Sequence, residues 1–476
     1  MRHTVFTPVR RMLTRRDVFG GIGSALGGIA LASLLADRAG AAAGSEAFRY
    51  DVKPRRPHFP ARAKRVILLF QNGGASQVDL FDPKPELNKR HGQKPGEGYV
   101  NTVDVKKTGA WLGTPFQFKP RGQCGMMLSE LLPGLARHAD DIALVRSMVS
   151  DHQNHEQAIW HFNTGSIQPG RPSIGSWVTY ALGSESQSLP AFAAILHPKG
   201  LPVDGVRNFS AGWMPPVYQG LAMRAEGTPV LNLTPRGSRE AAAARLELTQ
   251  ALNREHLRTR PDQLELEARI ASFELAARMQ LEASEALDLS REPKAMHDLY
   301  RTGDAEAGIH GRQLLLARRL LERGVRFVQV LHNGQPWDTH QKNESGLRDI
   351  CRKTDEPAAA LLTDLKQRGL LNDTLVIWSG EFGRTPMAEG KDGRDHHKFG
   401  FSLWMAGGGI RGGVTYGGTD DFGYKAVDNP VLMPDFHATI LHLLGIDHSR
   451  LTYHYETRDQ RLTDVHDGRV IKEILA

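Results

Sequence analysis

The stretch from Thr374 to Phe401, TLVIWSGEFGRTPMAEGKDGRDHHKFGF, indicates the fold class of the chain. It begins with the short apolar run TLVIW, which is typical of a strand buried on both faces of a parallel sheet. Glu381 follows at the end of this strand, and the stretch closes on Asp395, His396 and His397. Carboxylates and neutral imidazoles are ordinary ligands of divalent ions. The stretch therefore predicts part of a metal-dependent hydrolase site at a strand end.

Similar apolar runs recur along the chain and alternate with helical patterns. They are Arg65–Phe70, Ile142–Val145, Ala191–Leu196 and Val325–Leu331. Gly311–Arg323 has apolar residues at helical spacing and stops at Gly324, a residue that suits the end of a helix. Strands that alternate with helices predict an α/β fold with a mostly parallel sheet. In such sheets the ligand site lies beyond the carboxyl ends of the strands.

Two further segments are predicted to be helical. Pro357–Arg368 is predicted to start at Pro357, which suits a first helical turn, and to end before Gly369. Residues 238–289 are rich in Ala, Leu, Glu and Arg, and they predict two or three amphipathic helices interrupted near Arg260-Pro261. We expect a helical insertion that covers one side of the sheet; the alternative is a surface for a partner.

The N-terminus has the three parts of a twin-arginine export signal. Arg15 and Arg16 precede the apolar run GGIGSALGGIALASLLA, and Ala41-Ala42-Ala43 offers a cleavage site. The run is shorter than the roughly 20 residues that span a bilayer, and no later segment has the length and apolarity of a span. We expect a signal peptide over residues 1–43, a flexible lead-in over 44–61 and an α/β domain over 62–476. The mature protein would be periplasmic or extracellular.

Composition and charge narrow the class of partner. The chain is 40% hydrophobic and 24% charged, as expected of a globular protein, and its net charge of +7 includes the basic signal. Basic residues are scattered and form no stripe with interleaved aromatic residues, so no nucleic-acid partner is expected. Export would permit a disulfide between Cys124 and Cys351, but two separate thiols are the favoured interpretation. The oligomeric state stays open.

Polar clusters follow the predicted strands, and the first two lie in the N-terminal half. In QNGGASQVD, Asn72 or Asp79 can bind a metal and Ser76 can act as a nucleophile or donate to an anion. The alternative is a glycine turn selected for its backbone shape. In DHQNHE, which precedes a helix, a His or Asn can meet a phosphate or sulfate group, because helix N-termini favour anions. The alternative there is capping of the helix by Asn154.

The other two clusters lie in the C-terminal half. Asp338 and His340 are two residues apart in a predicted loop, a spacing at which both can bind one zinc-like ion. The alternative is an Asp turn beside a surface His. The last cluster is the opening one, which contains Glu381. The coincidence of four such clusters at predicted strand ends favours a site.

In their order, these pieces resemble the alkaline phosphatase and sulfatase superfamily, and more closely the DUF1501 family of exported sulfatase-like proteins. The resemblance covers nearly the whole mature chain. It is carried by GGASQVDLFDPKP, NHEQAIWHFNTG, GRQLLLARRLLERGVRFVQV, WDTH, TLVIWSGEFGRTP, GRDHHKFGFSLWMAGGGIRGG and DFHATILHLLGIDHSRLTY. It implies an alkaline-phosphatase-like sheet sandwiched by helices, and a divalent metal of the zinc or calcium type.

Carried over by position, the resemblance implies one metal site that looks intact. Its Asp and His ligands resemble Asp338 and His340, and its final His resembles His396 or His397. Asp395 remains a candidate ligand beside them.

The resemblance also implies a second metal site that has lost ligands. Asn72 stands where the superfamily has a metal-binding Asp, and Glu381-Phe382-Gly383 stands where it has Asp-His-Gly or Asp-Asn-Gly. The nucleophile position, counted back from Thr164-Gly165, is His155 in place of a hydroxyl or thiol, and no CxPSR motif is present. Phe382 cannot bind a metal.

These features predict a hydrolase of phosphate or sulfate esters with a reduced metal centre. Its substrate would be an anionic small molecule or a glycan ester. A metal would polarise the ester and lower the pKa of a bound water, and His155 or that water would attack. Arg384 would stabilise the anionic transition state, or else would pair with Glu381 or another acid. The alternative is a catalytically degenerate protein that binds an anionic glycan or a partner protein.

Overall fold

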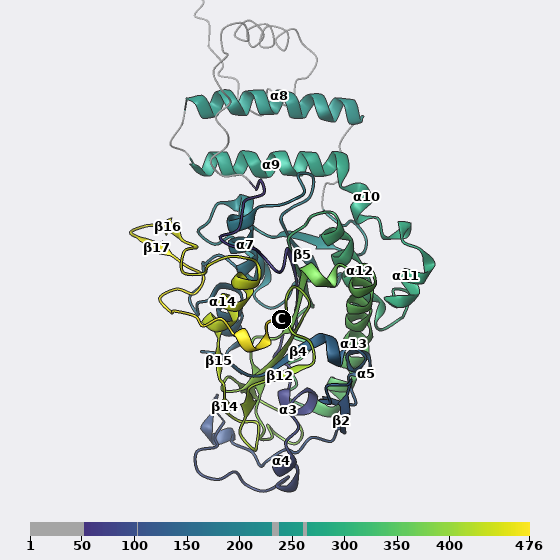
Figure 1. Cartoon of the computed structure of the whole chain (residues 1–476), viewed down its shortest axis with the longest axis vertical. Helices are drawn as coiled ribbons and strands as arrows, with labels where there is room; N and C mark the ends of the chain where they lie inside the picture. Colours follow the sequence, from purple (N-terminus) through teal and green to yellow (C-terminus); the bar gives the residue numbers. More distant parts are fainter. Residues whose placement is uncertain (1–51, 102, 231–237, 260–263) are drawn as a thin grey trace, which may run out of the picture. The chain divides into compact units, whose positions relative to one another are not determined.

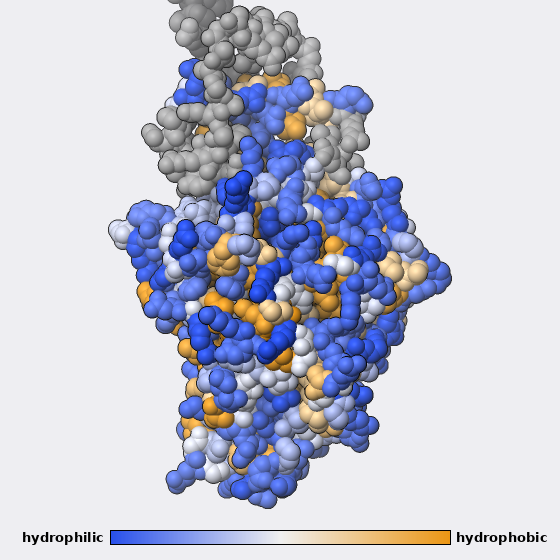
Figure 2. All heavy atoms as spheres, viewed as in Figure 1, coloured by the Kyte–Doolittle hydropathy of each residue, from blue (hydrophilic) through white to orange (hydrophobic). Residues whose placement is uncertain are grey.

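The computed structural model describes residues 52–476, apart from residue 102 and residues 231–237 and 260–263. The predicted signal peptide and the helix interruption at Arg260-Pro261 lie outside the described residues. Within the described part of the chain, no helix is both long and apolar enough to cross a membrane. On the face shown in Figure 2, the described residues are mostly hydrophilic, with hydrophobic ones scattered among them.

A nine-stranded sheet runs through the centre of the molecule (Figure 1). Its strand order is β12-β4-β11-β8-β1-β7-β5-β6, and β15 also pairs with β4. The strands are β1 Arg65–Phe70, β4 Ile142–Val149, β5 Phe192–Leu196, β6 Leu221–Arg224, β7 Phe327–Leu331, β8 Thr374–Ser379, β11 Phe401–Ala406, β12 Val414–Tyr416 and β15 Val431–Leu432. Among these, only β11 runs antiparallel to its neighbours. The predicted α/β class with a mostly parallel sheet is confirmed.

Alternate residues of each strand face two helical layers. Ile67 and Leu69 of β1 belong to one hydrophobic core, and Val66 and Leu68 belong to the other. The first core is completed by α12 (Gly308–Glu322) and α13 (Asn343–Gln367), and the second by α6 (His155–Thr164), α7 (Ile174–Leu182) and α14 (Met433–Leu443). Because both faces are covered, the strands are apolar without alternation.

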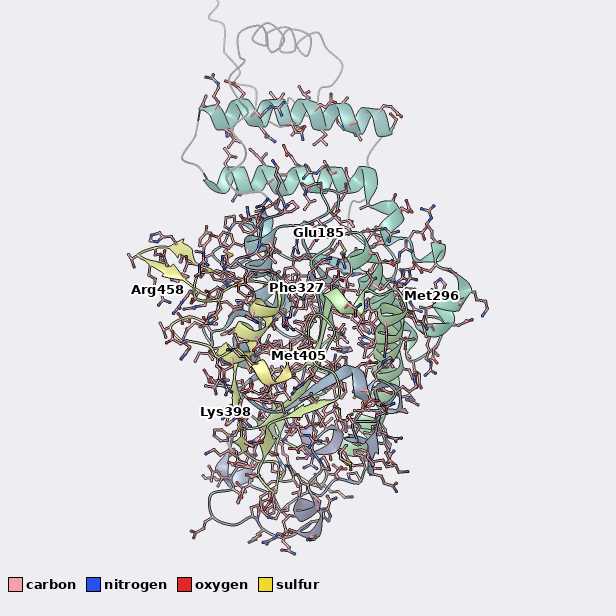
Figure 3. The ribbon with its side chains drawn as sticks, in the orientation of Figure 1. Glu185, Met296, Phe327, Lys398, Met405 and Arg458 are labelled. Atoms are coloured by element: carbon pink, nitrogen blue, oxygen red, sulfur yellow. The ribbon has the colours of Figure 1, made fainter. Side chains whose placement is uncertain are left out.

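The second core reaches across the sheet. Phe327 of β7 and Met405 of β11 both lie in it, and Figure 3 shows them near the middle of the molecule. Lys398 and Arg458 lie in loops and hairpins farther out in the same view. The uninterrupted apolar strands are thus explained by burial, as the sequence predicted.

Strands β1, β7 and β8 end level with one another. Phe70 of β1 pairs with Leu331 of β7 and with Ser379 of β8. Because these strands are parallel, the residues that follow them leave the sheet at one edge. Strand β4 runs in the same direction and leads into α6, and the antiparallel β11 starts from that edge. All four predicted polar clusters are therefore brought to the same edge of the sheet.

The prediction that a helix starts at Pro357 is wrong. Helix α13 spans 25 residues, and Pro357 lies inside it. Leu347 and Ile350, upstream of the proline, are buried in the same core as Leu361. Packing continues across the proline and offsets the backbone hydrogen bond that the proline removes. The predicted end of the helix before Gly369 is confirmed, and Gly369 has a φ of 70°.

The helices predicted between residues 238 and 289 are present. They are α8 (Arg239–Arg258), α9 (Leu264–Glu282) and α10 (Ser284–Leu287). Helices α8 and α9 lie side by side (Figure 1), α9 contacts the 3-10 turn η5 (Pro216–Tyr218), and α10 contacts α12. Cys124 is exposed and Cys351 is buried in α13, and both are free thiols.

Two buried histidines predict how stability depends on pH. Burial lowers the pKa of His310 in α12 to about 4 and that of His437 in α14 to about 3, whereas an unfolded imidazole titrates near pH 6.5. Between these values the unfolded chain binds more protons, so stability is lost as the pH falls below 6.5. We expect His437→Gln to reduce the slope of the unfolding free energy against pH by about 1.4 kcal/mol per unit.

Chemical denaturation at pH 7, 6 and 5 measures this slope. His454→Gln is the matched control, because the side chain of His454 is 69% exposed, and it should leave the slope unchanged. An equal slope for the wild type and His437→Gln would contradict the prediction.

Candidate functional site

His155 begins helix α6 and faces two acidic side chains. Asn154 precedes the helix in an extended conformation but makes no side-chain capping bond. The imidazole Nδ1 of His155 lies 2.6 Å from Oε1 of Glu381, and its Nε2 lies 3.5 Å from Oδ2 of Asp338. Because a carboxylate only accepts, Nδ1 carries a proton, whereas Nε2 has no hydrogen-bond partner among the described residues and lies within ion-pair distance of Asp338. Burial lowers the pKa of His155, but Asp338 and Glu381 more than offset it, so the net shift is upward.

Glu381 is fully buried at the end of β8 and is held by the first glycine loop. The backbone N–H of Gly73 donates to both of its carboxylate oxygens, at 2.9 and 3.2 Å. Gly73 has a φ of 114°, and a Cβ there would lie 2.6 Å from the backbone nitrogen of Asp338. Only glycine lets the loop after β1 approach both Glu381 and the Asp338 loop this closely.

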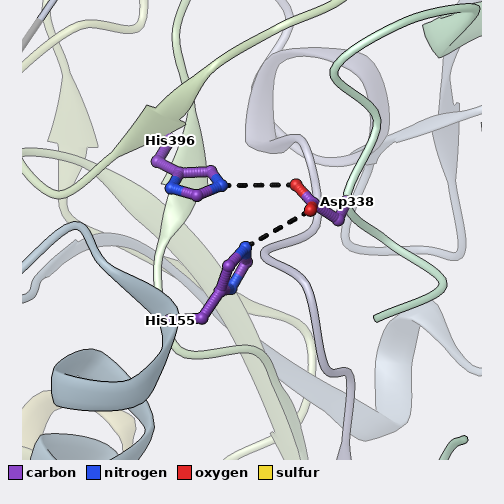
Figure 4. Close-up of side chains that lie close together, drawn as sticks. All are labelled: His155, Asp338 and His396. Atoms are coloured by element: carbon purple, nitrogen blue, oxygen red, sulfur yellow. Dashed lines mark hydrogen bonds and ion pairs between the residues drawn. The ribbon is translucent and has the colours of Figure 1, made fainter. Parts of the chain in front are cut away.

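Asp338 and two histidines form the centre of the site. Oδ1 of Asp338 lies 3.0 Å from Nε2 of His340 and 3.3 Å from Nε2 of His396, and the two nitrogens lie 2.9 Å apart. Figure 4 shows Asp338 between His155 and His396. Ligands at about 2.0–2.2 Å around a tetrahedral ion lie roughly 3.3 Å from one another. The three atoms therefore have the spacing of ligands to one ion.

Each of these imidazoles is oriented by a partner on its other nitrogen. Nδ1 of His396 donates to the carbonyl of Gln153 at 2.9 Å, and Nδ1 of His340 contacts the carboxylate of Glu389. In the neutral rings both Nε2 lone pairs then point toward the same place. Two lone pairs that close repel each other unless a proton or a metal ion lies between them. Partners of this kind, on the far nitrogen of each ring, are typical of metal-binding histidines.

The charges of the centre are strongly coupled. Burial raises the pKa of Asp338, but its bonds to the three histidines and the nearby Arg384 hold that pKa far below its usual range. The contact with Asp338 raises the pKa of His340 to about 8, against a smaller opposing effect of burial. Burial lowers the pKa of His396. Asp338 is therefore ionised throughout the physiological range.

Arg384 is paired with an acid, as one of the two interpretations predicted. Its guanidinium group is buried, and Nη2 contacts Oδ1 of Asp338 and the carbonyl of Gly73. Its Nε donates to the carbonyl of Gly74 at 2.9 Å and Nη1 to that of Arg394 at 3.1 Å. The partner is Asp338 rather than Glu381. Arg384 thus ties the loop after β1 to the carboxylate of Asp338.

Asp395 lies at the edge of this centre, and Asn72 lies in the loop after β1, where its backbone carbonyl accepts from the N–H of Trp337 at 3.3 Å. Oδ1 of Asp395 is 3.9 Å from Nδ1 of His340, and its Oδ2 accepts from the amide of Asn101 at 2.7 Å. Among the described residues, two groups could each hold a metal ion: His155, Asp338 and His396, and His340, Asp395 and His396. Asn72 is buried, and neither atom of its amide has a hydrogen-bond partner among the described residues. An unpaired buried amide costs about 1–3 kcal/mol, so its position fits one that contacts a ligand.

The structure does not bring Ser76 and His397 to the centre. Oγ of Ser76 donates to Asp79 at 2.6 Å, and Asp79 forms a buried ion pair with Arg394 at 2.7 Å. His397 is adjacent to His396 in β10 (His396–His397), so the two rings point to opposite faces. Nε2 of His397 contacts the carbonyl of Tyr424 instead. The strand geometry separates the two histidines that the sequence left as alternatives.

The sequence did not single out Glu389 or the carbonyl of Gln153. Glu389 lies in the opening stretch, in a turn closed by a bridge to Gly393. A Cβ at Gly393 would lie 1.7 Å from the carbonyl oxygen of His340, so a glycine is needed for the turn to reach His340. The sequence AEGKDG predicts a turn, but no local pattern predicts that its Glu389 contacts His340, which lies about 50 residues earlier in the chain.

A comparison with family models identifies the chain's relatives. The model described as "Protein of unknown function (DUF1501)" matches residues 63–475. No curated protein sequence matches the chain.

Solved structures similar to the chain include the following three. The PsFucS1 sulfatase from Pseudoalteromonas sp. is 12% identical with a TM-score of 0.38, covering 86% of this chain and 73% of its own. A protein in the alkaline phosphatase superfamily from Vibrio parahaemolyticus is 11% identical with a TM-score of 0.35, covering 93% and 78%. The phosphonate monoester hydrolase SpPMH from Silicibacter pomeroyi is 9% identical with a TM-score of 0.33, covering 87% and 76%.

The buried pair of Asp79 and Arg394 predicts that Asp79 is a structural residue. Asp79→Ala leaves the guanidinium group buried without its partner, which costs about 3–5 kcal/mol of unfolding free energy. Glu86→Ala breaks a more exposed pair with Arg90 and should leave the unfolding free energy nearly unchanged. Denaturant titration measures both values. A loss from Asp79→Ala as small as that from Glu86→Ala would contradict the assignment.

Proposed function

The chain belongs to the DUF1501 family, and we propose that it is an exported metal-dependent hydrolase of phosphate or sulfate esters with a single metal site. The ligands of this site are Asp338, His340 and His396. Export rests on the twin-arginine pattern at Arg15-Arg16. The substrate is an anionic ester.

The observation that carries the proposal is the meeting of two imidazole Nε2 atoms 2.9 Å apart beside one carboxylate oxygen. The opposite nitrogen of each ring is held by a separate partner, so both rings present the same face to this place. Bringing partly buried histidines and a carboxylate together costs desolvation free energy. A cluster with only a structural role would gain little to offset that cost, so the arrangement favours a ligand-binding role. A divalent ion bound there would polarise an ester oxygen and lower the pKa of a water.

His155 is the proposed catalytic residue beside the metal site. Its Nε2 faces Asp338, a ligand of that site, and its Nδ1–H is held by Glu381. A base oriented by a carboxylate is the arrangement that general-base and nucleophilic catalysis require. His155 either attacks the phosphorus or sulfur atom, which displaces the alcohol and leaves an adduct that water then hydrolyses, or removes a proton from a water that attacks that atom and displaces the alcohol. The buried amide of Asn72 is available to donate a hydrogen bond to an ester oxygen.

The ring of Phe382 supports a single metal site rather than two. Its centroid lies 4.9 Å from the rings of both His155 and His396. A Cβ at Gly74 would lie 2.7 Å from this ring, so Phe382 packs tightly against the first glycine loop. An apolar ring therefore occupies the place where the superfamily sequence pattern has a metal-binding imidazole. Glu381, beside it, accepts a hydrogen bond from Nδ1 of His155.

The second candidate function is binding without catalysis. The guanidinium group of Arg384 already binds Asp338 and backbone carbonyls. Among the described residues of the centre, no guanidinium group is therefore free to bind a transition-state anion. A protein of this kind would hold an anionic glycan or a partner protein. The two candidates differ in whether the ester is cleaved.

Metal analysis tests the proposal. We expect about one zinc-type ion per folded chain by mass spectrometry of the purified protein, and its loss in His340→Gln. His397→Gln is the matched control and should retain the ion, since His397 faces away from the centre. A folded wild type that holds no ion, and gains none when titrated with zinc, manganese or calcium, would refute the single-metal site.

Turnover tests the role of His155. His155→Ala should lower kcat for p-nitrophenyl phosphate or sulfate by about 10²–10⁴-fold while the metal content stays unchanged. Glu381→Gln should lower kcat as well, because it releases Nδ1 of His155. The wild type and His155→Ala are compared with equal metal loading. Equal turnover of the two proteins would remove His155 from the mechanism, and a metal-loaded wild type without turnover would favour the binding function.

A further inference from the structure

A cavity of about 610 Å³ lies outside the centre just described. Its lining includes Trp160, Trp213, Tyr455, Arg171, Arg207 and Gln168. The volume falls within the roughly 300–1,000 Å³ that is usual for small-molecule sites. Aromatic rings and arginines around one hollow are unusual for a surface that has no ligand, because both residue types are enriched where proteins bind partners.

Aromatic rings from separate segments form one wall of the cavity. The ring of Trp213 stacks on that of Tyr455, with centroids 5.0 Å apart and planes 13° from parallel. Tyr453 lies 5.2 Å from Trp213, and Trp177 supports it edge-on at 5.8 Å. Both tyrosines come from β16 (Tyr453–Tyr455), in the hairpin that carries Arg458 in Figure 3. Trp213 and Tyr455 are half-buried, so the wall is rigid and still accessible.

Ion pairs form the polar part of the cavity. Arg171 pairs with Asp464 at 3.0 Å, and Asp464 also pairs with Arg458 at 2.8 Å. Arg207 pairs with Asp204 at 3.0 Å, and Asp204 accepts from the indole N–H of Trp160. The cavity therefore offers donors and acceptors close together: Asp204 pairs with Arg207, and Asp464 is shared by Arg171 and Arg458.

We propose that this cavity binds a pyranose ring of an oligosaccharide. A sugar ring has an apolar C–H face, which packs on a flat aromatic ring, and a rim of hydroxyl groups that donate and accept at once. The aromatic rings of Trp213 and Tyr455 suit the apolar C–H face of the sugar. The arginine–aspartate pairs suit its hydroxyl groups, because they offer both hydrogen-bond donors and acceptors. A lipid chain would instead need a cavity without charged groups.

The cavity is connected to the metal centre by one helix. His155 begins α6, and Trp160 and Thr164, five and nine residues later, line the cavity. At 1.5 Å per residue, His155 and Trp160 are about 7.5 Å apart along the helix axis. A glycan held at Trp160 is thus anchored on the element that carries the proposed catalytic residue. The shared helix assigns glycan esters as the substrate of the proposed hydrolase. This assignment rests on the proposed function, whereas the saccharide site itself does not.

Binding to a printed array tests the cavity directly. The array carries neutral and sulfated hexasaccharides of galactan, fucan, glucan, mannan and glycosaminoglycan type, and the probe is the purified full chain. We expect binding to at least one series, measured again in solution by calorimetry. Trp213→Ala and Tyr455→Ala should each weaken it at least tenfold, with folding checked by circular dichroism. Phe273→Ala removes an aromatic ring that is 71% exposed on α9, and it should bind as the wild type does.

The outcomes separate this proposal from the hydrolase. His340→Gln should keep its glycan affinity, because the cavity does not include the metal ligands. If the wild type holds no metal but still binds a glycan through Trp213, the hydrolase fails and the saccharide site stands. If no hexasaccharide binds, or if Trp213→Ala and Tyr455→Ala bind like the wild type, the saccharide site is overturned. Loss of binding in His340→Gln would also overturn it, by placing the glycan at the metal centre.

Discussion

The carboxylate of Asp338 is the contact on which the rest of the site depends. One of its oxygens touches His340, His396 and Arg384, and the other faces His155. Three imidazoles and a guanidinium group, from helix α6, from the loop of Asp338 and from the hairpin of β9 (Gly383–Arg384) and β10, are thereby drawn to a single negative charge. Without that charge, the buried Arg384 would lack its counter-ion and the histidines would have no common partner, so the strands would end at one edge without forming a centre.

The sheet places the loops around this carboxylate next to one another. Parallel pairing of β1, β7 and β8 in level register places the loops after them side by side, and α6 enters from the same edge. Two glycines then permit contacts that a Cβ would block. Gly73 lets the first loop reach Asp338, and Gly393 lets the Glu389 turn reach His340. The side chains of the centre thus lie in loops and at the ends of elements, whereas the buried strands hold these segments in place.

Much of the fold could be predicted from the sequence, because burial on both faces leaves strands as plain apolar runs. The helix around Pro357 was predicted wrongly, since the stabilising contacts of α13 come from distant residues that a local proline signal does not report. The candidate ligands Asp338, His340 and His396 were recognisable by residue type and order. Which of His396 and His397 faces the centre depends on the phase of a two-residue strand. Glu389 and the ring wall of Trp213 and Tyr455 depend on tertiary contacts between distant segments, which no local pattern encodes.

The central claim is that one divalent ion binds to Asp338, His340 and His396. X-ray absorption spectroscopy of the zinc-loaded protein measures the ligand set of that ion most directly. The account predicts two imidazole nitrogens and one carboxylate oxygen at about 2.0–2.2 Å, with the fourth position held by solvent. It also predicts that one of the two imidazole contributions disappears in His396→Ala. A spectrum with sulfur ligands, or with oxygen ligands alone, would contradict the claim.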